Sequence, residues 1–243
     1  MSSDKAKDIL KEDLGRYLDE LAKEFKKEAG GRARAELILV GGGSVLANYS
    51  FRNMTTDLDA EIQTEASMKA AINRVGDRNG LPNGWLNTDF IKSESYSTKL
   101  RQVSRYYATF RQVLEVRTVR AEYLVAMKLK SGRIYKHDLS DVIGILMEHK
   151  EKKDPISRES VERAFAELYG DGAKMEEVSA ALLNRVFEDL DLGSLYQEAA
   201  SHEKMYRDIL IDFDRKYPGT IKKETVNDML IELKKRRARG TER

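Results

Sequence analysis

The most informative part of the sequence is residues 37–59, LILVGGGSVLANYSFRNMTTDLD. Residues 37–40 form a short apolar run that three glycines follow, and this combination predicts a buried strand that ends in a tight turn. Ser44 is suited to cap a short helix that runs from Val45 to about Ser50. Residues 58–62 then alternate between apolar and acidic side chains, which predicts a second strand.

The flanking segments extend this pattern into a mixture of strands and helices. Residues 4–28 and 66–79 have apolar side chains at helical spacing. Strands are expected at residues 106–110 and 113–118, with residues 111–112 as a turn or a continuation. Further helices are predicted at residues 120–131, 138–150, 158–169, 175–190, 195–215 and 223–239. The predicted fold class is therefore α+β, with a mixed-sheet core in residues 1–152 and a helical C-terminal region in residues 153–243.

Composition excludes several classes of protein. The chain has 243 residues, of which 41% are hydrophobic, enough for one large domain or for a core with a smaller appended region. No apolar run approaches the roughly 18 residues of a membrane span, and the charged N-terminus does not resemble a signal peptide. We therefore expect a soluble, cytoplasmic protein without membrane contact. The absence of cysteine excludes disulfides and thiol chemistry, and three histidines disfavour a zinc site.

Positive charge is concentrated in one segment. Residues 92–136 carry 11 basic and 3 acidic side chains, whereas the whole chain has a formal net charge of only +2. A basic block of this kind often faces phosphate groups, as in RNA. Lysines and arginines scattered over solvated strands and helices are an equally good explanation.

The glycine run is a candidate phosphate-binding turn. Glycines at the start of a helix allow backbone N–H groups to approach a phosphate, and the helix dipole favours its negative charge. The run is not a Walker A loop, because no Gly-Lys-Ser/Thr follows, and Leu46 stands where the dinucleotide fingerprint requires a third glycine. A plain turn between a strand and a helix would explain the glycines about as well.

Asp57 and Asp59 are candidate metal ligands. Because they are two residues apart on a predicted strand, their side chains point to the same face. Two adjacent carboxylates repel each other unless a cation is present, and oxygen ligands at this spacing suit Mg²⁺ together with substrate phosphates. The alternative is a polar strand edge that faces solvent. The glycine–serine turn shortly before Asp57 favours the metal interpretation.

These motifs, taken together in order, resemble the signature of the nucleotidyltransferase superfamily. The resemblance lies in Gly42-Gly43-Ser44, a short helix, Arg52, Thr55-Thr56 and Asp57-Leu58-Asp59. It implies a Mg²⁺-dependent transfer of a nucleotide from an NTP, in which the Gly42–Ser44 turn holds the triphosphate and Asp57 and Asp59 hold the metal. Arg52 is implied as a further nucleotide-binding residue.

Later motifs are similar to a bacterial branch that includes the toxins of abortive-infection systems. These are Trp85-Leu86-Asn87, Tyr123 to Leu129, Arg133, and Asp138-Leu139-Ser140-Asp141. In those toxins, residues that match Lys128 and Asp138 belong to the active site, and Asp141 is implied in nucleotide binding. His137 departs from the arginine that is frequent there, so one phosphate contact is missing from the pattern. The resemblance covers about residues 36–150.

Four site residues keep alternative explanations. Glu115 is the only candidate for the third carboxylate that the superfamily usually adds, but it is equally well explained as a surface residue that pairs with Arg117. Lys128 either extends to solvent from an apolar helix face or meets a buried anion. Asp138 and Asp141 lie on one side of a helix, where they could also cap its N-terminus.

The sequence therefore supports a Mg²⁺-dependent nucleotidyltransferase with a helical C-terminal region. The acceptor is RNA, a protein or a small molecule, and a role in a toxin–antitoxin or phage-defence system is implied by the resemblance. The first alternative is a non-catalytic binding or regulatory protein on the same fold, for instance an antitoxin. The second is a nucleic-acid-binding module that uses the basic block and the C-terminal helix. The sequence does not specify the oligomeric state.

Overall fold

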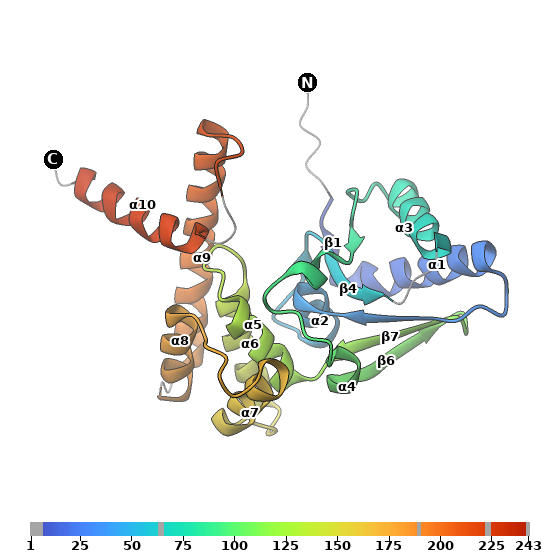
Figure 1. The fold of residues 1–243 in the computed structure, drawn as a ribbon, viewed down its shortest axis with the longest axis horizontal. Coiled ribbons are helices and arrows are strands. Elements are labelled where there is room, and N and C mark those ends of the chain that lie inside the picture. Colours follow the sequence, from blue (N-terminus) through green and yellow to red (C-terminus); the bar gives the residue numbers. More distant parts are fainter. Residues whose placement is uncertain (1–6, 63–65, 189–190, 222–224, 242–243) are drawn as a thin grey trace. The chain divides into compact units, whose positions relative to one another are not determined.

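The structure is a computed structural model that describes residues 7–62, 66–188, 191–221 and 225–241, with side chains up to residue 234. The fold is α+β, as the sequence predicts (Figure 1). Its strands are β1 (Ile9–Leu10), β2 (Ala35–Leu39), β3 (Met54–Thr55), β4 (Leu58–Ile62), β5 (Leu86–Asn87), β6 (Ser104–Phe110) and β7 (Leu114–Val119). Its helices are α1 (Lys11–Ala29), α2 (Gly41–Asn48), α3 (Ala66–Asn79), a 3₁₀ turn (Asp89–Lys92), α4 (Leu100–Val103), α5 (Ala121–Ser131), α6 (Asp138–Glu151), α7 (Arg158–Tyr169), α8 (Glu177–Glu188), α9 (Leu192–Lys216) and α10 (Val226–Thr241).

Within the described residues, five strands form a mixed sheet in the order β5-β4-β2-β7-β6. The central strand, β2, runs antiparallel to β4, with Leu39 opposite Ala60, and parallel to β7, with Leu39 beside Thr118. β6 and β7 form a hairpin through Arg111 and Gln112, which both have positive φ. These two residues therefore make a turn and do not continue a strand.

One face of this sheet forms the main hydrophobic core. Alternate residues of β2, β4 and β7, including Leu37, Leu58 and Val116, pack there against α1 and α3. Leu46 of α2 joins the same core. Because side chains alternate along a strand, the intervening residues point to the opposite face. That face carries Asp59, Glu61, Glu115 and Arg117.

The N-terminal helix is shorter than its apolar spacing predicts. Ile9 and Leu10 form β1, which pairs antiparallel with β3, and α1 begins only at Lys11. Pairing with a distant strand has overridden the local helical spacing at these two positions. Residues 4–6, 189–190 and 223–224 of the predicted helices lie outside the described residues.

The chain divides into two compact units that are not separated at residue 152. The first unit contains Met1–Met127 and Glu148–Ala173, and the second contains Lys128–Met147 and Lys174–Arg243. Helices α5 and α6 each contribute one end to each unit, so the predicted boundary near residue 152 falls inside the first unit. None of the helices in the described part of the chain has the length and apolar character needed to cross a membrane.

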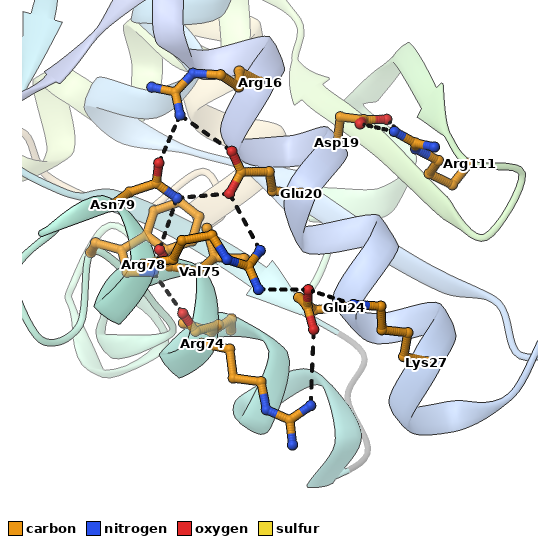
Figure 2. A network of polar contacts seen from close by, with 12 residues as sticks. Arg16, Asp19, Glu20, Glu24, Lys27, Arg74, Val75, Arg78, Asn79 and Arg111 are labelled. Carbon is orange, nitrogen blue, oxygen red and sulfur yellow. Dashed lines mark hydrogen bonds and ion pairs between the residues drawn. The ribbon is translucent and has the colours of Figure 1, made fainter.

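Helices α1 and α3 are joined by a polar network (Figure 2). Glu24 of α1 is buried, with 3% of its side chain exposed, and its Oε1 accepts hydrogen bonds from Arg78 of α3 at 2.9 Å and from Lys27 at 3.1 Å. Asn79 of α3 bonds to Arg16 and Glu20 of α1. The hydrogen bonds from Arg78 and Lys27 lower the pKa of Glu24 below its usual value.

We expect Glu24→Gln to destabilise the protein by about 1.5–3 kcal/mol at neutral pH, because it removes the negative charge that strengthens the hydrogen bonds from Arg78 and Lys27. The pKa of Glu24 is lowered in the folded state, so this stabilisation is present above the unfolded pKa and is lost as the pH falls through the folded pKa. Urea unfolding of both proteins between pH 7 and pH 3 measures the difference, which should shrink in acid. A difference that is constant over this range would contradict the assignment.

Candidate active site

The glycine turn lies beside the carboxylate of Asp59. β2 ends at Leu39, and α2 begins at Gly41, where φ is +51°. A Cβ atom added to Gly41 would lie 3.7 Å from Oδ2 of Asp59. The first N–H groups of a helix have no partner within that helix. The turn therefore presents backbone donors next to an acidic side chain.

The other two glycines are required by close packing. A Cβ atom on Gly42 would lie 2.9 Å from Oγ1 of Thr55, and one on Gly43 would lie 3.1 Å from Cδ2 of Leu58. The guanidinium of Arg52 lies 3.8 Å from the same position on Gly42. The glycines thus allow α2 to touch the loop that carries Arg52 and Asp57.

Asp57 and Asp59 flank Leu58, which is fully buried on the core side of the sheet. Both aspartates are only partly buried, and the alternation of β4 directs Asp59 away from the core. Asp57 precedes the strand, where its Oδ1 accepts a hydrogen bond from Thr56 Oγ1 at 3.2 Å. Its carbonyl oxygen accepts one from Thr55 Oγ1 at 3.0 Å.

The donor set suits Mg²⁺ better than a metal held by the protein alone. Among the described residues, no three His, Cys, Asp or Glu side chains are grouped so that they could hold a metal. Mg²⁺ commonly binds through one or two carboxylates together with substrate phosphates. Asp59, which lies beside the glycine turn, and the neighbouring Asp57 offer carboxylate oxygens of this kind.

Ser44 has a different place from the one predicted. It lies in the first turns of α2, which begins at Gly41 with Val40 as its N-cap, and does not cap a helix that starts at Val45. Its side chain is fully buried, and its Oγ accepts a hydrogen bond from the N–H of Val119 at 3.2 Å. Its own N–H donates to the carbonyl of Val40. Ser44 therefore fastens α2 to β7, and its hydroxyl is not directed to the surface of the turn.

Glu115 is not brought to the two aspartates. In the sheet register it lies opposite Glu36 of β2, whereas Asp59 is bonded through its carbonyl to Val40. Glu36 and Val40 are four residues apart, which corresponds to about 13 Å along the strand direction. Glu115 instead pairs with Arg117 at 2.9 Å. Its position matches the alternative of a surface ion pair.

Lys128 belongs to a buried charge cluster in the second unit. Its side chain is 6% exposed, and its Nζ lies 3.0 Å from Oδ1 of Asp138 and 2.8 Å from Oδ2 of Asp141. Arg133 donates to both oxygens of Asp138, through Nε to Oδ2 at 2.7 Å and through Nη2 to Oδ1 at 3.2 Å. Lys128 therefore meets buried anions and does not extend to solvent. The two aspartates lie in the first turn of α6, but their carboxylates bind these cations.

The cluster is charged on both sides. Burial alone would lower the pKa of Lys128 and raise that of Asp138, and it is the largest single influence on each group. The opposite charges together outweigh it. As a result, the pKa of Lys128 is raised by Asp141 and Asp138, and that of Asp138 is lowered by Lys128 and Arg133.

Sequence reasoning missed the residue that caps α6. Glu203 of α9 is 1% exposed, and its carboxylate accepts hydrogen bonds from the N–H groups of Leu139 and Ser140 and from the Ser140 hydroxyl. Burial raises the pKa of Glu203 to about 7. His137, at the position of the missing arginine, bonds through Nε2 to Arg207 at 3.1 Å. Only a contact prediction would have paired Glu203 with α6, because the residues are far apart in sequence.

Trp85 is a core residue. Its side chain is 1% exposed, and its indole N–H donates to the carbonyl of Ile72 at 2.9 Å. It also packs edge to face against Tyr17. This arrangement leaves no ring face available for stacking against a nucleotide base at the surface.

Residues 16–151 match a protein family described as "Nucleotidyltransferase of unknown function (DUF6036)". The match covers more than half of the chain. The chain belongs to this family. The family region includes the glycine turn, both aspartates and the Lys128 cluster, and it ends at the C-terminus of α6. No curated protein and no solved structure gives a significant match. Helices α7 to α10 lie beyond the family region.

Proposed function

We propose that this protein is a Mg²⁺-dependent nucleotidyltransferase that transfers a nucleotide from an NTP to an acceptor. One observation carries the proposal: the glycine turn at the start of α2 lies directly beside Asp59, with 3.7 Å between a Cβ position on Gly41 and Oδ2 of that residue. Such a turn offers N–H donors to phosphates, and the adjacent carboxylates offer oxygen ligands to the metal that accompanies them. Membership of the nucleotidyltransferase family supports the same conclusion.

In this proposal each group of residues has one task. The N–H groups of Gly41, Gly42 and Gly43 hold the terminal phosphates, and Arg52 adds a positive charge beside them. Asp57 and Asp59 hold Mg²⁺. When bound, the ion stabilises negative charge on the leaving pyrophosphate and polarises the α-phosphorus. The structure brings no third carboxylate from β7 to this place, so the group that activates the acceptor is not assigned.

Lys128 has a supporting task in the proposal. The resemblance to the bacterial toxins implies that it neutralises charge on the phosphates, and that Asp138 belongs to the same site. A buried lysine with two carboxylate partners is already charged and oriented.

The acceptor is RNA, a protein or a small molecule, and the net charge of +8 in residues 92–136 favours RNA. Exposed basic side chains of this segment include Lys92, Lys99 and Arg101. The resemblance to abortive-infection toxins supports a role in a toxin–antitoxin or phage-defence system.

Incubation with each of the four radiolabelled NTPs, in the presence of total RNA or cell lysate, tests the proposal. We expect label to enter a macromolecule or a small product with Mg²⁺ and not with EDTA. If the protein is instead a nucleic-acid-binding module, no label will be transferred. RNA affinity will then fall steeply with added salt, whether or not Mg²⁺ is present.

A further inference from the structure

Thr55 occupies a junction between the two halves of the candidate site. It is 9% exposed, and its hydroxyl donates to the carbonyl oxygen of Asp57 at 3.0 Å. The hydroxyl oxygen of Thr55 also lies 2.9 Å from the position that a Cβ atom on Gly42 would take. One hydroxyl group therefore touches the aspartate loop on one side and the glycine turn on the other.

We propose that Thr55 is the positioning residue that sets the distance between the glycine turn and the Asp57–Asp59 pair. The inference rests on the proposed function, because it concerns the same metal and phosphate site. With the carbonyl of Asp57 fixed by Thr55 and its carboxylate oriented by Thr56, the aspartate has little freedom to turn away. Residues that orient metal ligands commonly affect metal affinity nearly as much as the ligands do.

The N-terminal segment, Ile9–Lys11, anchors this junction. Ile9 pairs with Thr55 in the β1–β3 ribbon, and the N–H of Lys11 donates to the carbonyl of Asn53 at 2.8 Å. The ammonium group of Lys11 donates to the carbonyls of Leu46, at 2.9 Å, and Tyr49, at 2.6 Å, at the end of α2. The segment thus holds both the aspartate loop and the helix of the glycine turn.

This anchor lies outside the part of the chain that matches the family, which begins at residue 16. The family pattern alone therefore does not account for how the aspartate loop is held against α2. A cation at the C-terminal end of a helix is also electrostatically favourable, which strengthens the link between Lys11 and α2.

Binding of Mn²⁺ in the presence of saturating inorganic triphosphate, followed by electron paramagnetic resonance, separates positioning from folding. Thr55→Val keeps the shape of the side chain and removes the hydroxyl, and we expect a loss of Mn²⁺ affinity of about ten-fold or more. Thr55→Ser restores the hydroxyl and should remain within about three-fold of the wild type. Thr98→Val, at an exposed threonine, is the matched control and should bind as the wild type does. Thermal melts of all variants report on the fold.

A second variant covers the case in which Thr55→Val does not fold. Gly42→Ala pushes on Thr55 from the other side and should weaken Mn²⁺ binding by a similar factor. Wild-type affinity in folded Thr55→Val or Gly42→Ala, while Asp57→Asn loses binding, would overturn the inference and leave the proposed function intact. Wild-type affinity in Asp57→Asn and Asp59→Asn would overturn the metal site and the inference together.

Discussion

Asp59→Asn is expected to reduce nucleotide transfer by about a thousand-fold or more and to leave the fold intact. The substitution keeps the size of the side chain but removes a negative charge next to the glycine turn. A bound metal contributes several kcal/mol of charge stabilisation in the transition state, and each 1.36 kcal/mol corresponds to ten-fold in rate. Asp59 is only partly buried and lies on the face of the sheet away from the core, so the cost in stability should be small. Label transfer from an NTP under single-turnover conditions measures the loss.

Asp57→Asn should behave in the same way, and Asp89→Asn is the matched control. Asp89 is a surface aspartate, with 78% of its side chain exposed and an ion pair to Lys92 at 3.2 Å. Its replacement should leave transfer unchanged. Full activity in both Asp57→Asn and Asp59→Asn would contradict the assignment of the pair. A parallel loss of activity and of melting temperature would mean that the aspartates act through the fold.

The part of the fold that holds the site could be predicted because its signals are local. The apolar run before the glycines becomes β2, and the alternation of residues 58–62 becomes β4 with the predicted bounds. Buried strands and glycine turns impose such patterns directly on the sequence. The same alternation separates the buried Leu58 and Ala60 from Asp59, so the face that carries this carboxylate was predictable from one segment.

The environment of the site could not be predicted, because it depends on partners far along the chain. Ser44 looked like a phosphate ligand at a helix start, but its hydroxyl meets the N–H of Val119. Ile9 had helical spacing, but it pairs with Thr55. The sequence also does not reveal that Gly42 and Gly43 pack so closely against Thr55 and Leu58 that a Cβ atom would crowd them. Each of these outcomes is a long-range contact that has overridden a local preference.

Lys128 illustrates the same limit at the level of charge. The apolar residues around it left two interpretations, a lysine that reaches solvent, which is the usual one, and a lysine that meets a buried anion. The structure selects the second, because Asp138 and Asp141 face it from the first turn of α6. A lysine that reached solvent would tolerate replacement by methionine at a cost well under about 1.5 kcal/mol. Because Lys128 lies in an ion cluster, we expect this replacement to lower stability by much more.

We therefore expect Lys128→Met to destabilise the protein by about 3–5 kcal/mol at neutral pH, the cost of breaking a buried ion pair by removing one partner. The methionine fills most of the space but removes the positive charge that faces Asp138 and Asp141. Urea unfolding measures the loss, with Lys136→Met, at an exposed lysine of the same unit, as the matched control. The control should change stability by no more than about 0.5 kcal/mol.

The pH dependence of this loss distinguishes a charge effect from a packing effect. In the wild type, the pKa of Asp138 is lowered, so the stabilisation is present above the unfolded pKa and disappears as the pH falls through the folded pKa. In Lys128→Met, the carboxylates gain stability by taking up protons as the pH falls. The difference between the two proteins should therefore be greatest at neutral pH and should decrease below about pH 4, near the unfolded pKa of aspartate. Adding Asp141→Asn to Lys128→Met should recover part of the loss, because it removes one of the two buried negative charges that faced the lysine. A loss below about 1 kcal/mol, or one that does not change with pH, would show that the carboxylates do not depend on Lys128.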